Sequence, residues 1–258
     1  MITAALIGNP NSGKTTVFNK LTGSVQHVGN WPGVTVERKQ GFVRGAGSEK
    51  ILVVDLPGIY SLSPYSPEEV VSRDYLIGSS KEKPDVAVYV LDASNLERGM
   101  YLMTQVIDLG IPMVCILNMV DVAKKSGMKV DPEKLSKVLG CEVVETIGTK
   151  GFGTDLIAGA IHKAHESGRA PNKVTYSEDI EACVADIEPI LGEVVRPELV
   201  RWASLKLIER DSLILGDLEE ELVDRALENV TRLEKALGDD GMQIMATARY
   251  DAGSKLWA

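Results

Sequence analysis

The sequence predicts an α/β fold, a doubly wound and mainly parallel β-sheet, followed by a smaller all-α domain. In the first two thirds of the chain, buried-strand patterns alternate with helical patterns, the order that builds a parallel sheet with helices on both faces. After the linker Gly168–Asn172 no strand pattern recurs, and four amphipathic helical patterns follow. We therefore divide the chain into residues 1–168 and residues 169–258.

The strands are predicted from short apolar runs bounded by turn residues, and the helices from apolar residues spaced three or four apart. The expected strands are Ala4–Ile7, Val34–Val43, Ile51–Val54, Val86–Asp92, Pro112–Leu117 and Glu142–Thr146. The expected helices are Thr16–Leu21, Pro67–Gly78, Asn95–Leu109, Asp131–Gly140 and Gly153–Glu166, then Glu178–Leu191, Pro197–Arg210, Asp217–Leu237 and Gly241–Leu256.

Turn residues fix three further expectations. Thr22–Gly33 has the composition of a long loop, and its length and aromatic residue indicate a functional segment. The strands on either side of the turn Gly45–Ser48 should form an antiparallel hairpin at one edge of the sheet. Ser66 and Pro67 should be the cap and first residue of a helix.

Composition places the chain among soluble globular proteins, with 258 residues, 44% of them hydrophobic and 25% charged. We find no apolar stretch long enough to span a bilayer and no signal-peptide pattern at the N-terminus. Cys115, Cys141 and Cys183 are widely spaced within apolar patterns, so we expect small buried hydrophobes and not disulfides or metal ligands.

Charge is unevenly distributed along the chain. Residues 1–170 carry 18 basic and 18 acidic side chains, whereas residues 171–258 carry 10 basic and 19 acidic ones and hold all of the net charge of −9. We interpret the acidic faces of the later helices as solvated surfaces. A nucleic-acid-binding domain would need a basic face, so we expect no nucleic-acid partner.

The first motif that indicates chemistry is Gly8–Thr15, with the sequence GNPNSGKT between a predicted strand and a predicted helix. This is the context of a phosphate-binding P-loop, in which backbone N–H groups and the helix N-terminus converge on an anion. Lys14 would place a cation against the outer phosphates, and the Thr15 hydroxyl could coordinate their Mg²⁺. The segment therefore predicts a nucleotide site.

Two later motifs, each at the end of a predicted strand, refine the ligand. Asp55-x-x-Gly58 suits a carboxylate that acts on Mg²⁺ and a glycine N–H that approaches the γ-phosphate. Asn118-x-x-Asp121 places a carboxylate that can accept both N1–H and the amino group of guanine, a donor pair that adenine lacks. Asn118 itself should tie this loop to the P-loop. The combination predicts guanine nucleotide.

This set of motifs resembles the translation-factor-related GTPases. Their fifth motif would fall near Ile147–Gly151, where the usual Ser-Ala pair is replaced by Ile147 and Gly148. The Gly148 N–H could still contact guanine O6, whereas the serine side-chain contribution is absent.

A narrower resemblance follows from the runs Val28–Lys39, Asp55–Glu69 and Asn95–Arg98 together with Asn118–Asp121. They look like the ferrous-iron transport protein B (FeoB) family of bacteria and archaea. The likeness is dense over about residues 1–165 and is a matter of pattern beyond them. It implies a G domain and a helical, GDI-like domain on the cytoplasmic side of the cell membrane, with a membrane domain for Fe²⁺ C-terminal to this chain.

The resemblance also implies roles for individual residues. Residues 24–36 and 55–69 would be the two switch segments, and Thr35 would contact Mg²⁺ and the γ-phosphate. The residues implied to bind nucleotide are Gly8, Asn9, Pro10, Asn11, Ser12, Gly13, Lys14, Thr15, Thr16, Gly33, Val34, Thr35, Asp55, Leu56, Pro57, Gly58, Asn118, Met119, Asp121, Ile147, Gly148 and Thr149. The Mg²⁺ ligands would be Thr15, Thr35 and, through water, Asp55.

Hydrolysis requires a group that orients the attacking water, and the position that is Gln in small GTPases is Ile59 here. The resemblance to potassium-stimulated GTPases implies that Asn11 binds K⁺, which would replace an arginine finger. Asn11, Lys14, Thr35 and Gly58 are therefore our catalytic candidates. Glu68 and Glu69 fit better as carboxylates at a helix start.

Three readings remain open at this point. The first is a GTP-hydrolysing regulatory domain of an iron transporter, and the second is a soluble GTPase of ribosome or tRNA maturation. The third is a non-enzymatic module that relays its nucleotide state to a partner. A homo-oligomer also stays open. His27, His162 and His165 show no ligand spacing with the cysteines, so we assign no iron site.

Overall fold

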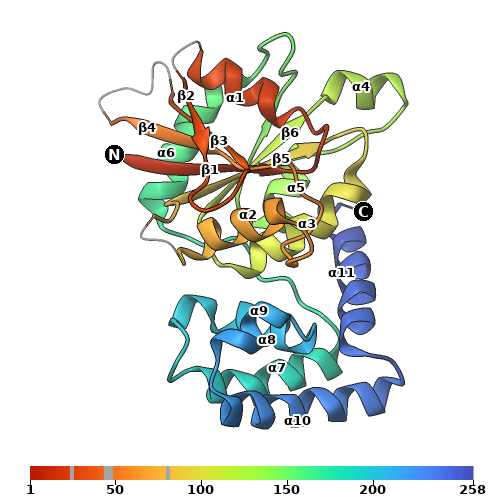
Figure 1. The fold of residues 1–258 in the computed structure, drawn as a ribbon. Helices are drawn as coiled ribbons and strands as arrows, with labels where there is room; N and C mark the ends of the chain where they lie inside the picture. Colours follow the sequence, from red (N-terminus) through yellow and green to blue (C-terminus); the bar gives the residue numbers. More distant parts are fainter. Residues whose placement is uncertain (24–25, 44–48, 80–81, 258) are drawn as a thin grey trace.

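The computed structural model describes residues 1–23, 26–43, 49–79 and 82–257. The sheet has seven strands. Figure 1 shows it flanked by helices, with a group of helices from the end of the chain below it. The predicted α/β fold class with a following all-α part is confirmed.

The sheet has the strand order β2-β3-β4-β1-β5-β6-β7. Its strands are β1 (Ile2–Gly8), β2 (Gln26–Asn30), β3 (Glu37–Phe42), β4 (Ile51–Asp55), β5 (Val86–Asp92), β6 (Met113–Asn118) and β7 (Glu142–Glu145). The pairs from β4 to β7 are parallel, and β2 and β3 run antiparallel to their neighbours. The sheet is therefore mainly parallel with one antiparallel edge, as predicted.

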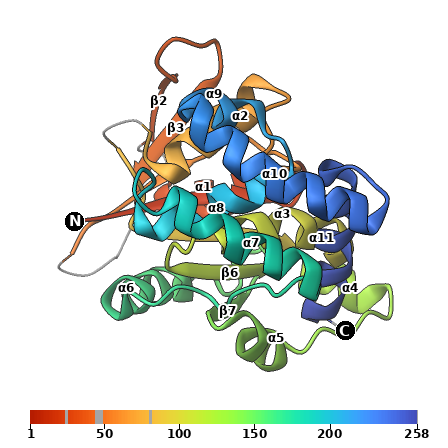
Figure 2. The same ribbon diagram turned by 90° about the horizontal axis from the view of Figure 1, so that it is seen from below.

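Helices cover both faces of the sheet (Figures 1 and 2). One face carries α1 (Lys14–Thr22) and α6 (Ile157–Ser167), and the other carries α2 (Pro67–Ile77), α3 (Leu96–Asp108) and α5 (Pro132–Leu139). Successive strand residues point to opposite faces, so Ala4 and Leu6 join the first core and Ala5 and Ile7 the second. All four are fully buried.

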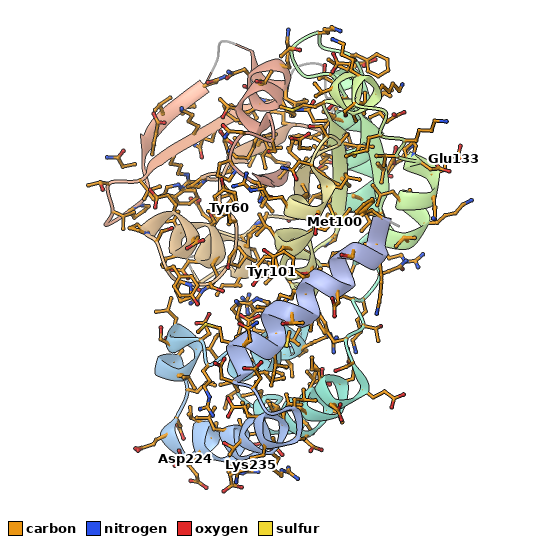
Figure 3. The ribbon with its side chains drawn as sticks, turned by 90° about the vertical axis from the view of Figure 1, so that its right-hand side faces the viewer. Tyr60, Met100, Tyr101, Glu133, Asp224 and Lys235 are labelled. Atoms are coloured by element: carbon orange, nitrogen blue, oxygen red, sulfur yellow. The ribbon has the colours of Figure 1, made fainter. Side chains whose placement is uncertain are left out.

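The later helices are α7 (Glu178–Leu191), α8 (Val200–Ile208, after a 3₁₀ turn at Pro197–Leu199), α9 (Ser212–Asp217), α10 (Glu220–Leu237) and α11 (Gly241–Trp257). Helix α11 leaves α10 and runs along α3 toward α5, as Figure 3 shows. Gly253 permits this close approach, because a Cβ there would lie 3.1 Å from the Cβ of Met100. The helical group and the α2–α3 face of the sheet thus share one apolar core.

One expected loop is partly a strand. The prediction that Thr22–Gly33 is a loop is wrong for β2, which pairs antiparallel with β3. The predicted hairpin strands do pair as β3 and β4, but β2 and not β3 is the edge strand. Four of the five β2 residues are exposed, so the strand rests on backbone pairing and carries no apolar alternation to reveal it. The expected turn Gly45–Ser48 lies outside the described residues.

The helices begin and end close to the predicted positions. Ser66 caps α2 through a capping box, in which its Oγ accepts from the Glu69 N–H and the Glu69 carboxylate accepts from the Ser66 N–H. This confirms the predicted cap and the helix-start role of Glu69. The sequence did not predict the short helices α4 (Val120–Lys125) and α9, and α6 is preceded by a 3₁₀ turn at Thr154–Leu156.

Two compositional expectations can be compared with the structure. Cys115 and Cys183 are buried free thiols as expected, whereas Cys141 is half-buried. Among the helices within the described ranges, none combines the length and apolar character needed to cross a membrane.

Candidate functional site

The P-loop leaves the carboxyl end of β1, which lies between β4 and β5 at the centre of the sheet. Gly13 caps α1 in the left-handed conformation with φ of 84°, and a Cβ there would overlap the side-chain amide of Asn118. A Cβ on Gly8 would lie 2.6 Å from the Val90 carbonyl oxygen. Both glycines are therefore required by packing, and they let the loop curl at the position where open α/β sheets bind ligands.

Lys14 and Asp55 form an ion pair within this loop region. Both side chains are largely buried, with 8% and 7% of their surface exposed. Burial raises the pKa of the Asp55 carboxyl above its usual value, although the Lys14 ammonium acts in the opposite direction. A cation for phosphate and an oxygen donor for a hard metal ion thus meet where two parallel strands end.

Asn118 connects three segments of the site, and the sequence predicted one of these connections, the tie to the P-loop. Its Nδ2 donates to the Ser12 carbonyl at 2.9 Å, which ties the end of β6 to the P-loop. Its Oδ1 accepts from the Thr146 hydroxyl at 3.0 Å and from the Gly148 N–H at 3.0 Å. The N–H predicted to contact guanine O6 is therefore shared with Asn118, and its contact with a base stays a prediction.

Asp121 lies in the first turn of α4, three residues after Asn118. Its carboxylate accepts from Lys150 Nζ at 3.0 Å, and this hydrogen bond lowers the pKa of Asp121. The side chain is 25% exposed, so an incoming base can reach it. Met119, which precedes α4, has φ of 61°. This left-handed turn lets Asn118 and Asp121 face the same edge of the sheet.

The predicted first switch segment contains β2 and the hairpin turn that joins β2 to β3. Thr35 is exposed there, and residues 24–25 of the segment lie outside the described residues. Trp31 is 7% exposed and contacts Tyr75 of α2 edge to face, with ring centroids 5.3 Å apart. The Arg38 guanidinium lies 4.7 Å from the Trp31 ring centre. Trp31 is thus a buried anchor of the segment.

The predicted second switch segment begins against the P-loop. A Cβ on Gly58 would lie 3.1 Å from Pro10 Cα, so this glycine fits close to the P-loop backbone. The Ile59 N–H donates to the Gly8 carbonyl at 3.4 Å, and the Ile59 side chain is 3% exposed. The position that is Gln in small GTPases is therefore an apolar core residue here.

Sequence reasoning missed the contribution of α3. Asn9 Nδ2 donates to the Arg98 carbonyl at 3.3 Å, and the Tyr89 hydroxyl donates to Asn9 Oδ1 at 3.2 Å. A cavity of about 100 Å³ beside the P-loop is lined by Asn9, Pro10, Asn11, Ser12, Asp92, Asn95, Arg98 and Gly99. The sequence marks Asn95–Arg98 only as a run that resembles the family. The P-loop motif itself does not predict that Asn9 contacts α3.

Asn11 faces this cavity from a left-handed backbone conformation with φ of 67°. The residue is exposed, and within the described part of the chain its side-chain amide makes no hydrogen bond. An amide oxygen that is free and exposed beside the P-loop suits a monovalent cation.

The acidic side chains of the helical part were expected to lie on solvated surfaces. Glu209 and Asp211, near α3, are exceptions, because they are buried and paired with basic side chains.

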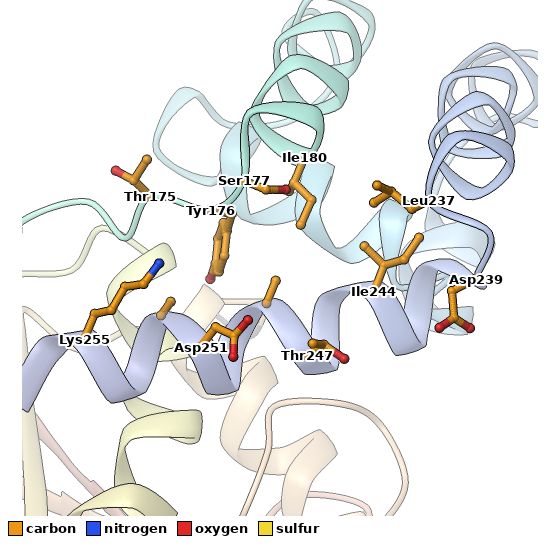
Figure 4. Close-up of a pocket in the computed structure, with 12 residues that line it drawn as sticks. Thr175, Tyr176, Ser177, Ile180, Leu237, Asp239, Ile244, Thr247, Asp251 and Lys255 are labelled. Atoms are coloured by element: carbon orange, nitrogen blue, oxygen red, sulfur yellow. The ribbon is translucent and has the colours of Figure 1, made fainter.

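A second cavity, of about 320 Å³, lies far from these motifs between α11, the start of α7 and the end of α10 (Figure 4). Figure 4 shows Ile180, Leu237 and Ile244 around its apolar part and Asp251 and Lys255 on α11. It contains no predicted site residue. The cavity is therefore separate from the predicted nucleotide site, although it also carries polar side chains such as Lys255.

Comparison with known proteins gives matches over nearly the whole chain. Residues 2–161 match the model of the ferrous iron transport protein B family, and residues 176–257 match the model of the FeoB cytosolic helical domain. The Fe(2+) transporter FeoB of Escherichia coli strain K12 is 38% identical over 258 residues, which cover 96% of this chain and 32% of that protein. A FeoA/FeoB fusion protein of Porphyromonas gingivalis is 42% identical over 82% of this chain and 25% of that protein.

Solved structures give the same result. A crystal structure of an S. thermophilus NFeoB mutant bound to GDP superimposes with a TM-score of 0.92 at 41% identity, covering 99% of both chains. Another, of S. thermophilus NFeoB bound to GDP·AlF4⁻ and K⁺, has a TM-score of 0.86 at 41% identity, again over 99% of both chains. This chain spans about a third or less of the length of the curated relatives it matches.

Proposed function

This chain belongs to the FeoB family of ferrous-iron transport proteins, and from that premise we propose that it binds guanine nucleotide with Mg²⁺ and slowly hydrolyses GTP. We propose further that it is the cytoplasmic regulatory part of a Fe²⁺ transporter whose membrane domain follows it, since it matches about a third of such relatives. Family membership favours this reading over a soluble GTPase of ribosome or tRNA maturation.

The observation that carries the proposal is the meeting of three motifs at one edge of the sheet. Lys14 pairs with Asp55, and Asn118 joins the P-loop to the segment that contains Gly148. A phosphate that enters the P-loop would meet the Lys14 ammonium and the N-terminus of α1. Because Asp121 lies at the same edge, the base would extend toward α4.

The donors present fit both metal ions. Thr15, in the first turn of α1, and Asp55, at the end of β4, offer the oxygen ligands that Mg²⁺ requires, and bound Mg²⁺ would neutralise phosphate charge. Asn11 offers the exposed amide oxygen for K⁺, in keeping with the K⁺ found in the S. thermophilus NFeoB structure. Thr35 is the third proposed Mg²⁺ ligand, and its hairpin would have to bring it to the nucleotide.

Lys14, Asn11, Thr35 and Gly58 are our proposed catalytic residues. Lys14 would stabilise charge on the outer phosphates, and the Gly58 N–H would face the γ-phosphate. The remaining proposed nucleotide contacts come from the P-loop, residues 33–35, residues 55–58, the Asn118–Asp121 loop and residues 147–149. We also propose the division into residues 1–168 and residues 169–258, with α11 packed on both parts.

The test is GTP hydrolysis measured in KCl and in NaCl, with Lys14→Ala as the inactive reference. We expect wild-type turnover to be clearly faster in KCl, because K⁺ held by Asn11 would add positive charge beside the γ-phosphate. Asn11→Ala should reduce the KCl rate to the NaCl rate while GDP still binds. Equal rates in the two salts would disprove the K⁺ role, and a wild-type rate no higher than that of Lys14→Ala would disprove GTP hydrolysis.

A further inference from the structure

We propose that Arg98 is a positioning residue for GTP hydrolysis, because it holds Tyr60 and with it the backbone of residues 58–60 against the P-loop. The inference rests on the proposed GTPase function and concerns the same site. The carrying observation is that the Arg98 guanidinium carbon lies 4.5 Å from the centre of the Tyr60 ring. Such a distance is that of a cation–π contact.

The backbone of residues 58–60 matters because no side chain at position 59 can orient water. Ile59 is buried, and its N–H hydrogen bond to Gly8 is long, at 3.4 Å. Gly58 has no side chain to hold it and only rests on Pro10. Tyr60 is the first residue after them with an exposed side chain, at 42%. Ile59 is held by packing in the apolar core, and the contact of Tyr60 with α3 holds the exposed side of this backbone.

Arg98 is well placed for this role because its own backbone is fixed to the P-loop. Its carbonyl accepts from Asn9 Nδ2. The next residue, Gly99, packs so closely that a Cβ there would overlap Leu91 Cδ1. The first turn of α3 is thus joined to the P-loop by a hydrogen bond and to β5 by close packing, and Arg98 extends from this turn to Tyr60.

The Tyr60 ring is the partner of the Arg98 charge. Within the described residues its guanidinium forms no ion pair with a carboxylate. It also lies in the first turn of α3, where the helix macrodipole disfavours a cation. The negative face of the Tyr60 ring offsets that unfavourable position. Arg98 lines the cavity that also contains Asn11, so the contact lies beside the proposed K⁺ ligand.

The test is a double-mutant cycle on kcat and KM for GTP in KCl, with GDP affinity measured separately. Arg98→Met and Tyr60→Leu should each lower kcat about two- to fivefold, the size of an exposed cation–π contact. The double variant should lose no more than either single variant, and Tyr60→Phe should restore the rate because it keeps the ring. KM and GDP affinity should stay unchanged, since neither residue contacts the base or the P-loop cation.

Phe42→Leu is the matched control, because it removes the ring of the Lys50–Phe42 contact at 5.7 Å, on β3 and away from the P-loop. It should leave kcat unchanged. Additive losses in the double variant, an unchanged kcat in Arg98→Met, or a parallel fall in GDP affinity would overturn the inference. So would a loss of about a thousandfold in Arg98→Met alone, which is the effect of an arginine on the phosphoryl group itself. An inactive wild type would instead overturn the proposed function.

Discussion

Two regions of this molecule bury carboxylates beside basic side chains, and they differ in how completely the charges are matched. At the P-loop, Asp55 forms an ion pair with Lys14 and has Lys39 beside it across the β3–β4 pair, yet burial keeps the pKa of that carboxyl raised. Between α3, α8 and α11, Glu209 accepts from both Lys206, at 2.6 Å, and Arg249, at 2.9 Å. Burial alone would raise the pKa of Glu209, but the two cations lower it to about 2.

The second region forms one continuous network that joins the sheet domain to the helical group. Its charged members are Arg73 in α2, Asp108 in α3, Lys206 in α8, Glu209 directly after α8, Asp211 directly before α9, and Arg249 in α11. Three cations and three carboxylates balance, and Arg249 and Lys206 are fully buried. We infer that the P-loop pair leaves capacity for phosphate and Mg²⁺, whereas the network is a permanent joint.

The largest expected effect comes from breaking the network at its most connected cation. Arg249 donates to Asp108 at 2.7 Å, to Glu209, and to the Tyr176 hydroxyl at 2.7 Å. Arg249→Met would leave two buried carboxylates without this partner, so we expect the free energy of unfolding to fall by about 3–5 kcal/mol. Denaturant unfolding measures it, with GDP affinity expected to change little because no network member contacts the P-loop.

Arg225→Met is the control for that prediction, because Arg225 is an exposed arginine of α10. Its effect should stay within about 0.5 kcal/mol. If Arg249→Met has the same free energy of unfolding as Arg225→Met, the network does not stabilise the contact between the sheet domain and the helical group. Arg249→Lys, which keeps the charge but loses the two-sided hydrogen bonding, should fall between the two.

A smaller effect follows from the pKa of Glu209. Because its folded pKa is about 2 against 4.5 for the free side chain, its contribution is present above pH 4.5 and is lost as pH falls toward 2. Near neutral pH, Glu209→Gln should therefore be less stable than wild type by about 3 kcal/mol. The pKa of Asp108 is raised by burial and acts in the opposite direction, but it is present in both proteins and cancels.

The measurement is the unfolding free energy of wild type and Glu209→Gln as a function of pH. We expect the gap between the two curves to close through the acid window between 4.5 and 2. A gap that is constant with pH would mean that Glu209 stabilises the joint by packing and not by charge. In that case the pKa of Glu209 would not differ from that of Asp55 in the way proposed here.

The same contrast explains how far the sequence could predict this molecule. The residues of the P-loop region belong to short contiguous motifs at the ends of parallel strands, and such strand ends meet at one edge of a sheet. The tie between Asn118 and the P-loop was therefore predictable before any coordinates. The αL conformation at Gly13 and the cap at Ser66 were likewise encoded by local residue types.

The network was not predictable, because its members are ordinary helix charges that become partners only through packing. Asp108 and Arg249 are 141 positions apart, and each alone fits a solvated helix face. The edge strand β2 was missed for a related reason, since backbone pairing holds it and leaves no apolar pattern. The Arg98–Tyr60 contact also depends on where α3 packs, which no motif specifies.

The smallest predicted effect has the opposite sign and concerns Asp55. A carboxyl whose folded pKa is raised disfavours folding once pH exceeds its unfolded pKa, so removing its charge should stabilise the nucleotide-free protein near neutral pH. We expect Asp55→Asn to gain about 0.5–1 kcal/mol of unfolding free energy, as is common when a functional group is replaced. The same variant should lose the Mg²⁺-dependent part of its GDP affinity, measured with Mg²⁺ and with EDTA.

Asp224→Asn is the matched control, because Asp224 is an exposed carboxylate of α10 that Figure 3 labels far from the P-loop. It should change neither stability nor the effect of Mg²⁺ on GDP binding. Opposite signs for Asp55→Asn and Glu209→Gln would show that one region is built to exchange its partners and the other to keep them. If Asp55→Asn destabilises the protein as much as Glu209→Gln, Asp55 is a structural carboxylate and Lys14 is its permanent partner, which would leave no cation free for the nucleotide.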